Sequence, residues 1–225
     1  MKNIKDTINF FNKSEIQFQL QSFRNRVRDF FDNNPVFYET LIVHSVKSRI
    51  KNSFHLEDKI IRKQEQKGVE ITKENLFSEI TDLIGVRVLH LYFDQFHIIH
   101  KEIMRQIEQK EWVLFEEPKA YTWDPETVEL FNKLGIKTVR KDSYTSMHYV
   151  VKPNNNKNAI CCEIQVRTLF EEIWGEIDHS INYPNKTKSI ACSEQLKVLS
   201  KLASTGTRLA DSIYRSHNEH INNKS

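Results

Sequence analysis

The sequence predicts an α+β domain in which helices at both ends of the chain enclose a mixed core of helices and strands. Two observations predict this class. Apolar residues recur at helical spacing near both ends of the chain, in 8–66 and in 193–215. Between 85 and 168, four segments are rich in the β-branched and aromatic residues typical of strands. There is no internal repeat and no long linker, so residues 1–225 are expected to form a single domain.

The N-terminal region, 8–66, is expected to consist of helices. A first helix is predicted over 8–32 and ends at an Asn-Asn-Pro run, 33–35. A second helix is predicted over 36–50 by apolar positions at helical spacing: Phe37, Leu41, Ile42, Val46 and Ile50. A short basic helix should follow near 54–66, with Gly68 just after its end.

The central core is expected to span 74–184 and to contain the sheet. Its expected helices are 74–81, 94–110, 125–135 and 169–182, and its expected strands are 85–92, 112–115, 144–152 and 159–168. Asp124 is expected to cap the helix that begins at Pro125, and Pro184 to end the helix over 169–182. On the last of these helices, Trp174, Ile177 and Ile181 form an apolar stripe that we expect in the core. A C-terminal helix is predicted over 193–215, followed by a polar tail expected to fray. Its expected apolar face consists of Leu196, Leu199, Leu202, Leu209 and Ile213.

The composition excludes several classes of protein. The formal net charge is only +3, so the total charge indicates no partner, and we expect neither DNA nor a membrane to be one. No run of about 18 apolar residues could span a bilayer, and the N-terminus lacks a secretory apolar stretch. The five glycines form neither a GxGxxG motif nor a Walker loop, so side chains would have to hold any nucleotide phosphates.

The three cysteines are Cys161, Cys162 and Cys192. Their odd number and the lack of C-x-x-C spacing fit neither a disulfide framework nor a zinc site. Cys161 and Cys162 start an apolar run, so we expect buried thiols in a protein of the reducing cytoplasm.

The segment 44–63 is basic. Within it, Lys59, Arg62 and Lys63 stand at i, i+3 and i+4, so one face of the predicted helix presents three cations that could grip a polyphosphate. Taken alone, such a charge run is more often a solvated helix face.

Asp82 directly precedes a predicted strand, and Arg87 lies within it. A carboxylate at the mouth of a strand suits magnesium, which binds one or two carboxylates together with phosphate oxygens. Capping a turn explains an aspartate at this position equally well. Arg87 could stack on a base or pair with an acid.

Alternation along two predicted strands brings polar side chains to one face. The two rows are Tyr144, Ser146 and His148 in YTSMHYVVK, and Glu163, Gln165 and Arg167 in EIQVRT. Such rows are either the floor of an active site or the solvated face of a sheet. A tyrosine at a strand edge belongs more often to the core or its rim than to a base-stacking site.

Together these fragments resemble one known family, the synthetase domain of the RelA/SpoT (p)ppGpp synthetases. The resemblance covers about 44–184 and rests on five motifs in family order: Arg49-Ile50-Lys51 with Lys59 and Arg62; Asp82, Gly85 and Arg87; Tyr144, Ser146 and His148; Glu163, Gln165, Arg167 and Thr168; and Trp174, Glu176, Asp178 and His179. No single motif is specific, but their joint order is. The chain lacks the His-Asp dipeptide and the length of the long, multidomain members, so it resembles a small, stand-alone alarmone synthetase.

The resemblance implies a nucleotidyltransferase-like fold, a mixed β-sheet flanked by helices with the site on the sheet face. It implies transfer of the β,γ-diphosphate of ATP to the 3′-hydroxyl of GDP or GTP, with release of AMP and with Mg²⁺ as cofactor. It leaves the oligomeric state open, a homo-oligomer included.

The resemblance also assigns roles to residues. Asp82 and Glu163 would hold Mg²⁺ and, with Gln165, form the catalytic group, in which Glu163 would also assist deprotonation of the attacking hydroxyl. The ATP-binding residues would be Arg49, Lys51, Lys59, Arg62 and Arg87, with the adenine between the two arginines Arg49 and Arg87. The acceptor nucleotide would be bound by Tyr144, His148, Arg167 and Lys141, with Tyr144 stacked on the guanine.

Three departures from the family pattern concern the acceptor and phosphate sites. Ser143 replaces the usual glycine, His55 a frequent serine, and Glu172 a common asparagine. They leave the Asp82–Glu163 pair untouched, and two alternatives to the implied reaction stay open. One is the same transfer onto the 3′ end of tRNA or onto adenosine nucleotides, and the other is a non-catalytic nucleotide- or RNA-binding module. A pure binder has no need of the magnesium pair that Asp82 and Glu163 would form.

Overall fold

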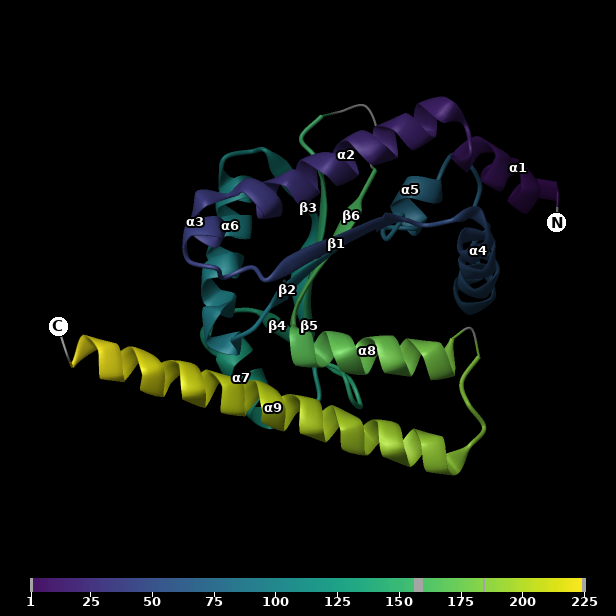
Figure 1. Ribbon diagram of the computed structural model, residues 1–225. Coiled ribbons are helices and arrows are strands. Elements are labelled where there is room, and N and C mark those ends of the chain that lie inside the picture. Colours follow the sequence, from purple (N-terminus) through teal and green to yellow (C-terminus); the bar gives the residue numbers. More distant parts are fainter. Residues whose placement is uncertain (1, 156–159, 184, 224–225) are drawn as a thin grey trace.

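The computed structural model describes residues 2–155, 160–183 and 185–223 (Figure 1). Its centre is a six-stranded sheet made of β1 (Ser45–Ile50), β2 (Ile84–His90), β3 (Trp112–Thr122), β4 (Lys137–Arg140), β5 (Ser146–Pro153) and β6 (Cys162–Thr168). The strand order is β1-β2-β6-β5-β3-β4. β2 pairs with β6, and β3 with β4, in parallel, while the other pairs are antiparallel. The predicted α+β class, with a mixed sheet flanked by helices, is confirmed.

The helices surround this sheet. They are α1 (Lys2–Phe11), α2 (Ser14–Asn33), α3 (Pro35–Glu39), α4 (Ser53–Lys67), α5 (Leu76–Glu79), α6 (Phe96–Glu108), α7 (Pro125–Lys133), α8 (Leu169–Asn182) and α9 (Ile190–Asn222), with a 3₁₀ turn η1 (Phe93–Gln95) before α6. Figure 1 shows α2 above the sheet and the contacting pair α8 and α9 below it. Within the described ranges, no helix combines the length and the hydropathy that crossing a bilayer requires.

One face of the sheet forms the main core. Alternate residues of the central strands are buried there, including Val86, Val88, Ile164 and Val166. Helix α2 covers them because its own buried residues recur every three or four positions: Ile16, Leu20, Phe23, Val27 and Phe31. Full burial of each such side chain contributes about 1.5–3 kcal/mol. The intervening strand residues therefore point to the opposite face, which is available for polar chemistry.

The predicted helix over 36–50 is confirmed only over 36–39 and is wrong beyond that. Helix α3 ends at Glu39, Leu41 has a positive φ of 50°, and β1 begins at Ser45. Val46 and Ile50 fit helical spacing, but they fit alternation equally well. Antiparallel pairing with β2 decides between the two, since it places Arg49 opposite Gly85. The N-terminal region is therefore not wholly helical, because it supplies the outermost strand beside the site.

The remaining elements largely follow the prediction. The helix predicted over 8–32 is interrupted near residue 12 and forms α1 and α2. Helices α4 to α8 and strands β2, β5 and β6 are confirmed, and Cys161 and Cys162 are buried as expected. Strand β3 continues well beyond 115 through two register shifts, and the short strand β4 beside it was not predicted. The polar, proline-containing sequence of 116–119 obscures this part of the sheet.

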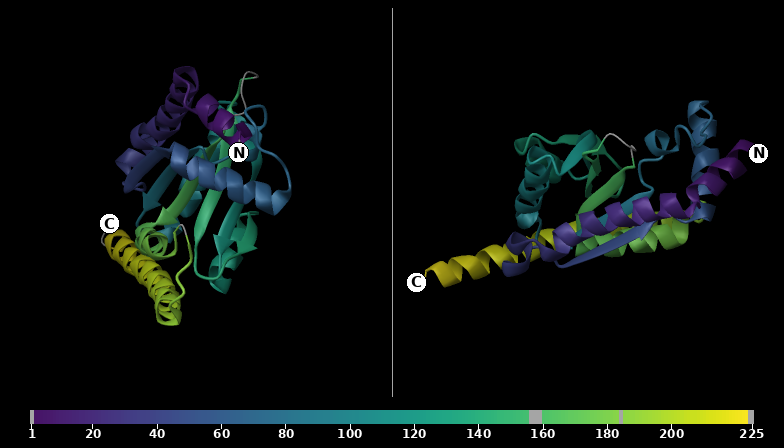
Figure 2. Two further views of the ribbon diagram at one scale, coloured as in Figure 1. Left: turned by 90° about the vertical axis from the view of Figure 1, so that its right-hand side faces the viewer. Right: turned by 90° about the horizontal axis from the view of Figure 1, so that it is seen from above.

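Helix α9 differs most from the prediction at the C-terminal end. It continues to Asn222, so the tail predicted to fray is helical over 216–222, and Figure 2 shows this end projecting past the sheet. Its buried side is mostly small and polar: Leu196, Ser200, Ala203, Ser204, Thr207 and Asp211. The predicted apolar face is wrong at Leu202, Leu209 and Ile213, which are exposed, and the α8 stripe is wrong at Ile177 and Ile181. Small residues let α8 approach closely, as where Phe170 lies against Gly206.

Helix α4 depends on its N-cap, since the Asn52 side chain accepts a hydrogen bond from the His55 N–H at 2.8 Å. Replacing Asn52 by alanine is expected to lower the free energy of unfolding by about 1 kcal/mol, because one N–H at the helix start loses its partner. Urea unfolding followed by circular dichroism measures this change. Asn52→Asp retains a cap and should stay close to wild type, whereas equal losses in both variants would contradict the capping role.

Candidate active site

The face of the sheet turned away from α2 carries the predicted polar row. Register places Arg87 of β2 beside Gln165 of β6, and Gln165 beside His148 of β5. Glu163 and Arg167 precede and follow Gln165 at alternate positions of β6, so they project on the same side. The EIQVRT row therefore points toward two cavities on this side of the sheet, and the solvated-face alternative is not supported.

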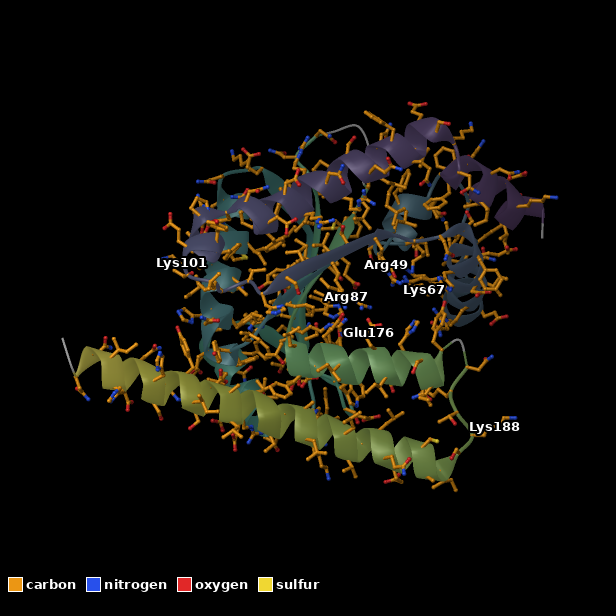
Figure 3. All side chains as sticks on the ribbon, viewed as in Figure 1. Arg49, Lys67, Arg87, Lys101, Glu176 and Lys188 are labelled. Carbon is orange, nitrogen blue, oxygen red and sulfur yellow. The ribbon has the colours of Figure 1, made fainter. Side chains whose placement is uncertain are left out.

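A first cavity, of about 220 Å³, lies between the outer strands and α8. It is lined by Lys47, Ser48, Arg49, Asp82, Gly85, Arg87, Glu163, Gln165, Glu176 and His179. Figure 3 shows Arg49 and Arg87 in the space between the sheet and α8, where Glu176 lies. The Arg49 side chain lies over Gly85, within 3.7 Å of the position that a Cβ would take, which is an ordinary van der Waals distance.

A second, larger cavity of about 540 Å³ adjoins the first. Its lining includes aromatic rings and charged groups: Tyr121, Lys141, Tyr144, His148, Arg167, Trp174, Asp178 and Tyr183. Arg87, Glu163 and His179 line both cavities. A ligand in one cavity would therefore share these side chains with a ligand in the other.

Asp82 lies at the mouth of β2 in the first cavity, where two lysines hold it. Its Oδ2 atom is 2.6 Å from Lys59 Nζ and 3.1 Å from Lys51 Nζ. Burial raises the pKa of Asp82, but the two ammonium groups outweigh burial and hold the pKa below its usual value. Burial lowers the pKa of Lys51, and the Asp82 charge opposes that shift. Asp82 is therefore a carboxylate anion at neutral pH.

Glu163 is held in a chain of hydrogen bonds. Its Oε1 atom lies 3.2 Å from His148 Nδ1, and its Oε2 accepts a hydrogen bond from Gln165 Nε2 at 2.6 Å. His148 Nε2 lies 2.9 Å from the Tyr144 hydroxyl. Burial raises the pKa of Glu163, as does the nearby Asp82 charge, but the contacts with His148 and Gln165 bring the pKa below its usual value. Glu163 is thus ionised and fixed in orientation.

The Asp82–Glu163 pair is the candidate for holding a metal ion. Within the described ranges there is no group of three or more His, Cys, Asp or Glu side chains that could hold one. Mg²⁺ needs fewer, because it binds one or two carboxylates and completes its shell with phosphate and water oxygens. Asp82 Oδ1 is buried and has no hydrogen-bond partner among the described residues, so a cation would satisfy it. The residues present fit Mg²⁺.

The predicted ATP-binding residues are mostly brought together. Arg49 and Arg87 line the first cavity, and Lys51 and Lys59 meet there at Asp82. Arg62 is exposed on α4 and is not among the described residues that line either cavity. The three cations of this helix face thus have different surroundings, with Lys59 at Asp82, Lys63 at Glu79 and Arg62 exposed.

The predicted acceptor residues Tyr144, His148, Arg167 and Lys141 all line the second cavity. The Arg167 guanidinium lies 5.9 Å from the centre of the Tyr144 ring. The Lys141 ammonium lies 5.4 Å from the centre of the Tyr121 ring. The four side chains thus form one wall of cations and rings, a suitable surface for a base and its phosphates.

Sequence reasoning missed several residues of the two cavities. Lys47 was noticed only as part of a basic segment, although it lines the first cavity. Tyr121 was missed because β3 was expected to end before it. Tyr183 stacks on His179 with ring centres 4.5 Å apart and meets His55 of α4 at 5.3 Å, so it joins α8 to α4 beside the second cavity. The contact of Tyr183 with His55 joins parts of the chain that are far apart in sequence, so no local pattern could have predicted it.

The fold and the site define a nucleotide-handling protein, since carboxylates for a metal, cations for phosphates and rings for bases converge on one sheet face. The chain belongs to the RelA/SpoT family: the sequence profile described as "Region found in RelA / SpoT proteins" matches residues 48–188. This range contains every site residue that the sequence predicted, and Lys47 lies just before it.

Individual relatives agree with this assignment. The chain is 26% identical over 166 residues to the GTP pyrophosphokinase YwaC of Bacillus subtilis (strain 168), covering 72% of this chain and 69% of YwaC. Its fold matches a GTP pyrophosphokinase family protein from Streptococcus pneumoniae with a TM-score of 0.69 at 18% identity, over 92% of this chain and 94% of that one. It also matches small alarmone synthetase 1 from Bacillus subtilis bound to its product pppGpp, with a TM-score of 0.65 at 19% identity, over 90% and 95% of the two chains. The nucleotidyltransferase-like architecture expected from the resemblance is therefore that of solved alarmone synthetases.

Proposed function

We propose that the protein is a (p)ppGpp synthetase that transfers the β,γ-diphosphate of ATP to the 3′-hydroxyl of GDP or GTP and releases AMP. One observation carries the proposal: Asp82 and Glu163, distant in the chain, line one cavity with the cations that a triphosphate needs. Family membership and the relatives named GTP pyrophosphokinase and small alarmone synthetase support the same reaction.

ATP occupies the first cavity in this proposal. Arg49 and Arg87 lie against the adenine, because a planar guanidinium stacks on a base. Lys51 and Lys59, which contact Asp82, supply positive charge for the phosphates, and Asp82 and Glu163 would hold Mg²⁺. When bound, Mg²⁺ neutralises charge that develops on the transferred diphosphate. The cations of the protein add to that neutralisation and orient the chain of phosphates.

The acceptor occupies the second cavity, with its base on Tyr144 and its phosphates near Lys141 and Arg167. Its 3′-oxygen attacks the β-phosphorus of ATP, the bond from that phosphorus to the bridging α,β-oxygen breaks, and AMP leaves with this oxygen. Glu163 lines both cavities, so it lies where the hydroxyl proton is released and can accept it. His148 and Gln165 hold its carboxylate in place for this role.

A free nucleotide suits the second cavity better than tRNA. Four of the six cations of the basic segment 44–63 are paired with carboxylates: Lys47 with Glu172, Lys51 and Lys59 with Asp82, and Lys63 with Glu79. An extended RNA would need an exposed basic track rather than these paired lysines.

A product assay tests the reaction and the acceptor together. The protein is incubated with Mg²⁺, ATP labelled at the γ-phosphate, and GDP, GTP, ATP alone or tRNA, and products are separated by anion-exchange chromatography. We expect label in a guanosine nucleotide with one AMP released per transfer, and no transfer when Mg²⁺ is chelated. Label found only in tRNA or in adenosine nucleotides would replace the acceptor, and binding without AMP release would contradict the enzyme assignment.

A further inference from the structure

Glu172, in the first turn of α8, is a buried carboxylate in contact with three cations. Its side chain is almost wholly buried and is not among the described residues that line either cavity. Its Oε1 accepts hydrogen bonds from Lys47 Nζ at 2.8 Å and Arg87 Nη1 at 3.3 Å, and its Oε2 lies 2.7 Å from Arg167 Nη2. Burial raises the pKa of Glu172, but Lys47 and the two guanidinium groups outweigh burial and lower it. Glu172 is therefore an anion behind the wall of the site.

The three cations serve the two cavities differently. Lys47 lines the first cavity, Arg167 lines the second, and Arg87 lines both. They come from β1, β6 and β2, three strands that lie next to one another in the sheet. One carboxylate thus contacts a cation of each cavity and the cation that the cavities share.

The cluster is expected to order as a unit. A buried charge is tolerated only while its partners remain in place. If one cation moves, the Glu172 carboxylate is less well paired, and its contacts with the other two cations change as well. Arg87 has a second partner, Glu176, on the more exposed side of α8. Glu176 pairs with neither Lys47 nor Arg167 in the described structure, so it anchors Arg87 without linking the cavities.

We propose that Glu172 is a positioning residue that couples the binding of the two nucleotides, an inference that rests on the proposed function. A nucleotide that fixes Arg87 in the first cavity also fixes Glu172 and, through it, Arg167. The second nucleotide then meets a cation that is already ordered, so it binds more tightly. Because coupling between two sites is reciprocal, the acceptor strengthens ATP binding by the same factor.

Calorimetric titration of the intact protein tests the coupling. The ligands are GDP and an ATP analogue with a methylene group between the α- and β-phosphorus, which blocks transfer. Each is titrated alone and with the other saturating, and the ratio of the two Kd values is the coupling factor. We expect a factor of about 5 or more in the wild type, the lower end of typical couplings. In Glu172→Gln it should fall to near one.

Glu176→Gln is the matched control, since it removes the other anchor of Arg87. It should change the Kd of the ATP analogue and keep the wild-type coupling factor. Steady-state kinetics give a second readout: in Glu172→Gln, the KM of each substrate should no longer depend on the concentration of the other. A general loss of structure would not produce this selective change.

Three outcomes contradict the inference: a wild-type factor near one, an unchanged factor in Glu172→Gln, or an equal loss in Glu176→Gln. If Glu172→Gln fails to fold, Glu172→Asp keeps the charge and shortens its reach, and it should give an intermediate factor. A wild-type factor in Glu172→Asp would then count against the inference. A wild-type protein that forms product without coupling contradicts only this inference, whereas one that binds neither nucleotide contradicts the proposed function.

Discussion

Asp82→Asn and Glu163→Gln are each expected to lower kcat by a factor of about 10²–10³ or more, the size of loss seen when one group that stabilises transition-state charge is removed. Both substitutions keep the shape of the side chain and remove its charge. The first cavity would retain its cations but lose half of the carboxylate pair that fits Mg²⁺. AMP release at saturating ATP and GDP measures the effect.

Glu79→Gln is the matched control for these variants. Glu79 is also a carboxylate held by lysines of α4, Lys63 and Lys67, but it is not among the described residues that line the two cavities. Its replacement should leave kcat close to wild type. Circular dichroism should show that all three variants are folded. Near-normal turnover in Asp82→Asn or Glu163→Gln would refute the metal assignment.

Between pH 4.5 and pH 8, the free energy of unfolding of the wild type should fall by about 3 kcal/mol more than that of Glu171→Gln. This difference corresponds to the pKa shift of a single carboxyl group, that of Glu171. Glu171, in the first turn of α8, is buried and lines a further cavity among β6, α7 and α9. Burial raises its pKa to about 7, against the lowering effects of the Thr145 N–H and of Arg167. A carboxyl with a raised folded pKa stabilises fully below its unfolded pKa, and this contribution is lost as pH rises through the folded value.

Urea unfolding at a series of pH values, on wild type and Glu171→Gln, measures this difference. Glutamine resembles the protonated carboxyl and can still accept the Thr145 N–H hydrogen bond. Asp211, whose pKa is raised to about 6 mainly by burial, lines the same cavity and titrates in both proteins, so its effect cancels in the comparison. Parallel stability profiles for the two proteins would show that Glu171 does not titrate as expected.

Much of the candidate site could be predicted from the sequence where a strand pattern was strong. Alternation alone placed Glu163, Gln165 and Arg167 on one face, and β6 confirms this because it is a central strand with a buried opposite face. That Asp82 lies near Glu163 could not be derived from local pattern. It came from the family order of motifs, and the structure accounts for it by the parallel pairing of β2 and β6.

The failures share a physical cause, which is that long-range packing overrides local periodicity. Apolar spacing around 46–50 suited a helix, but pairing with β2 made it a strand. The spacing of the leucines on α9 predicted a buried apolar face. The close approach of α8 instead favours small residues such as Ala203 on the buried side of α9. On α4, spacing alone could not distinguish Arg62, which is exposed, from Lys59, which pairs with Asp82.

The parallel pairing of β2 with β6 also determines when the site can form during synthesis of the chain. The helices and strands from α6 to β5 lie between these two strands in the sequence. A ribosome that has completed β2 has made Asp82 and Arg87 but not Glu163, and pairings of this kind form late in folding. Substrate can therefore stabilise only finished molecules. A truncated polypeptide ending before residue 162 would gain no protection from ATP against cellular proteases.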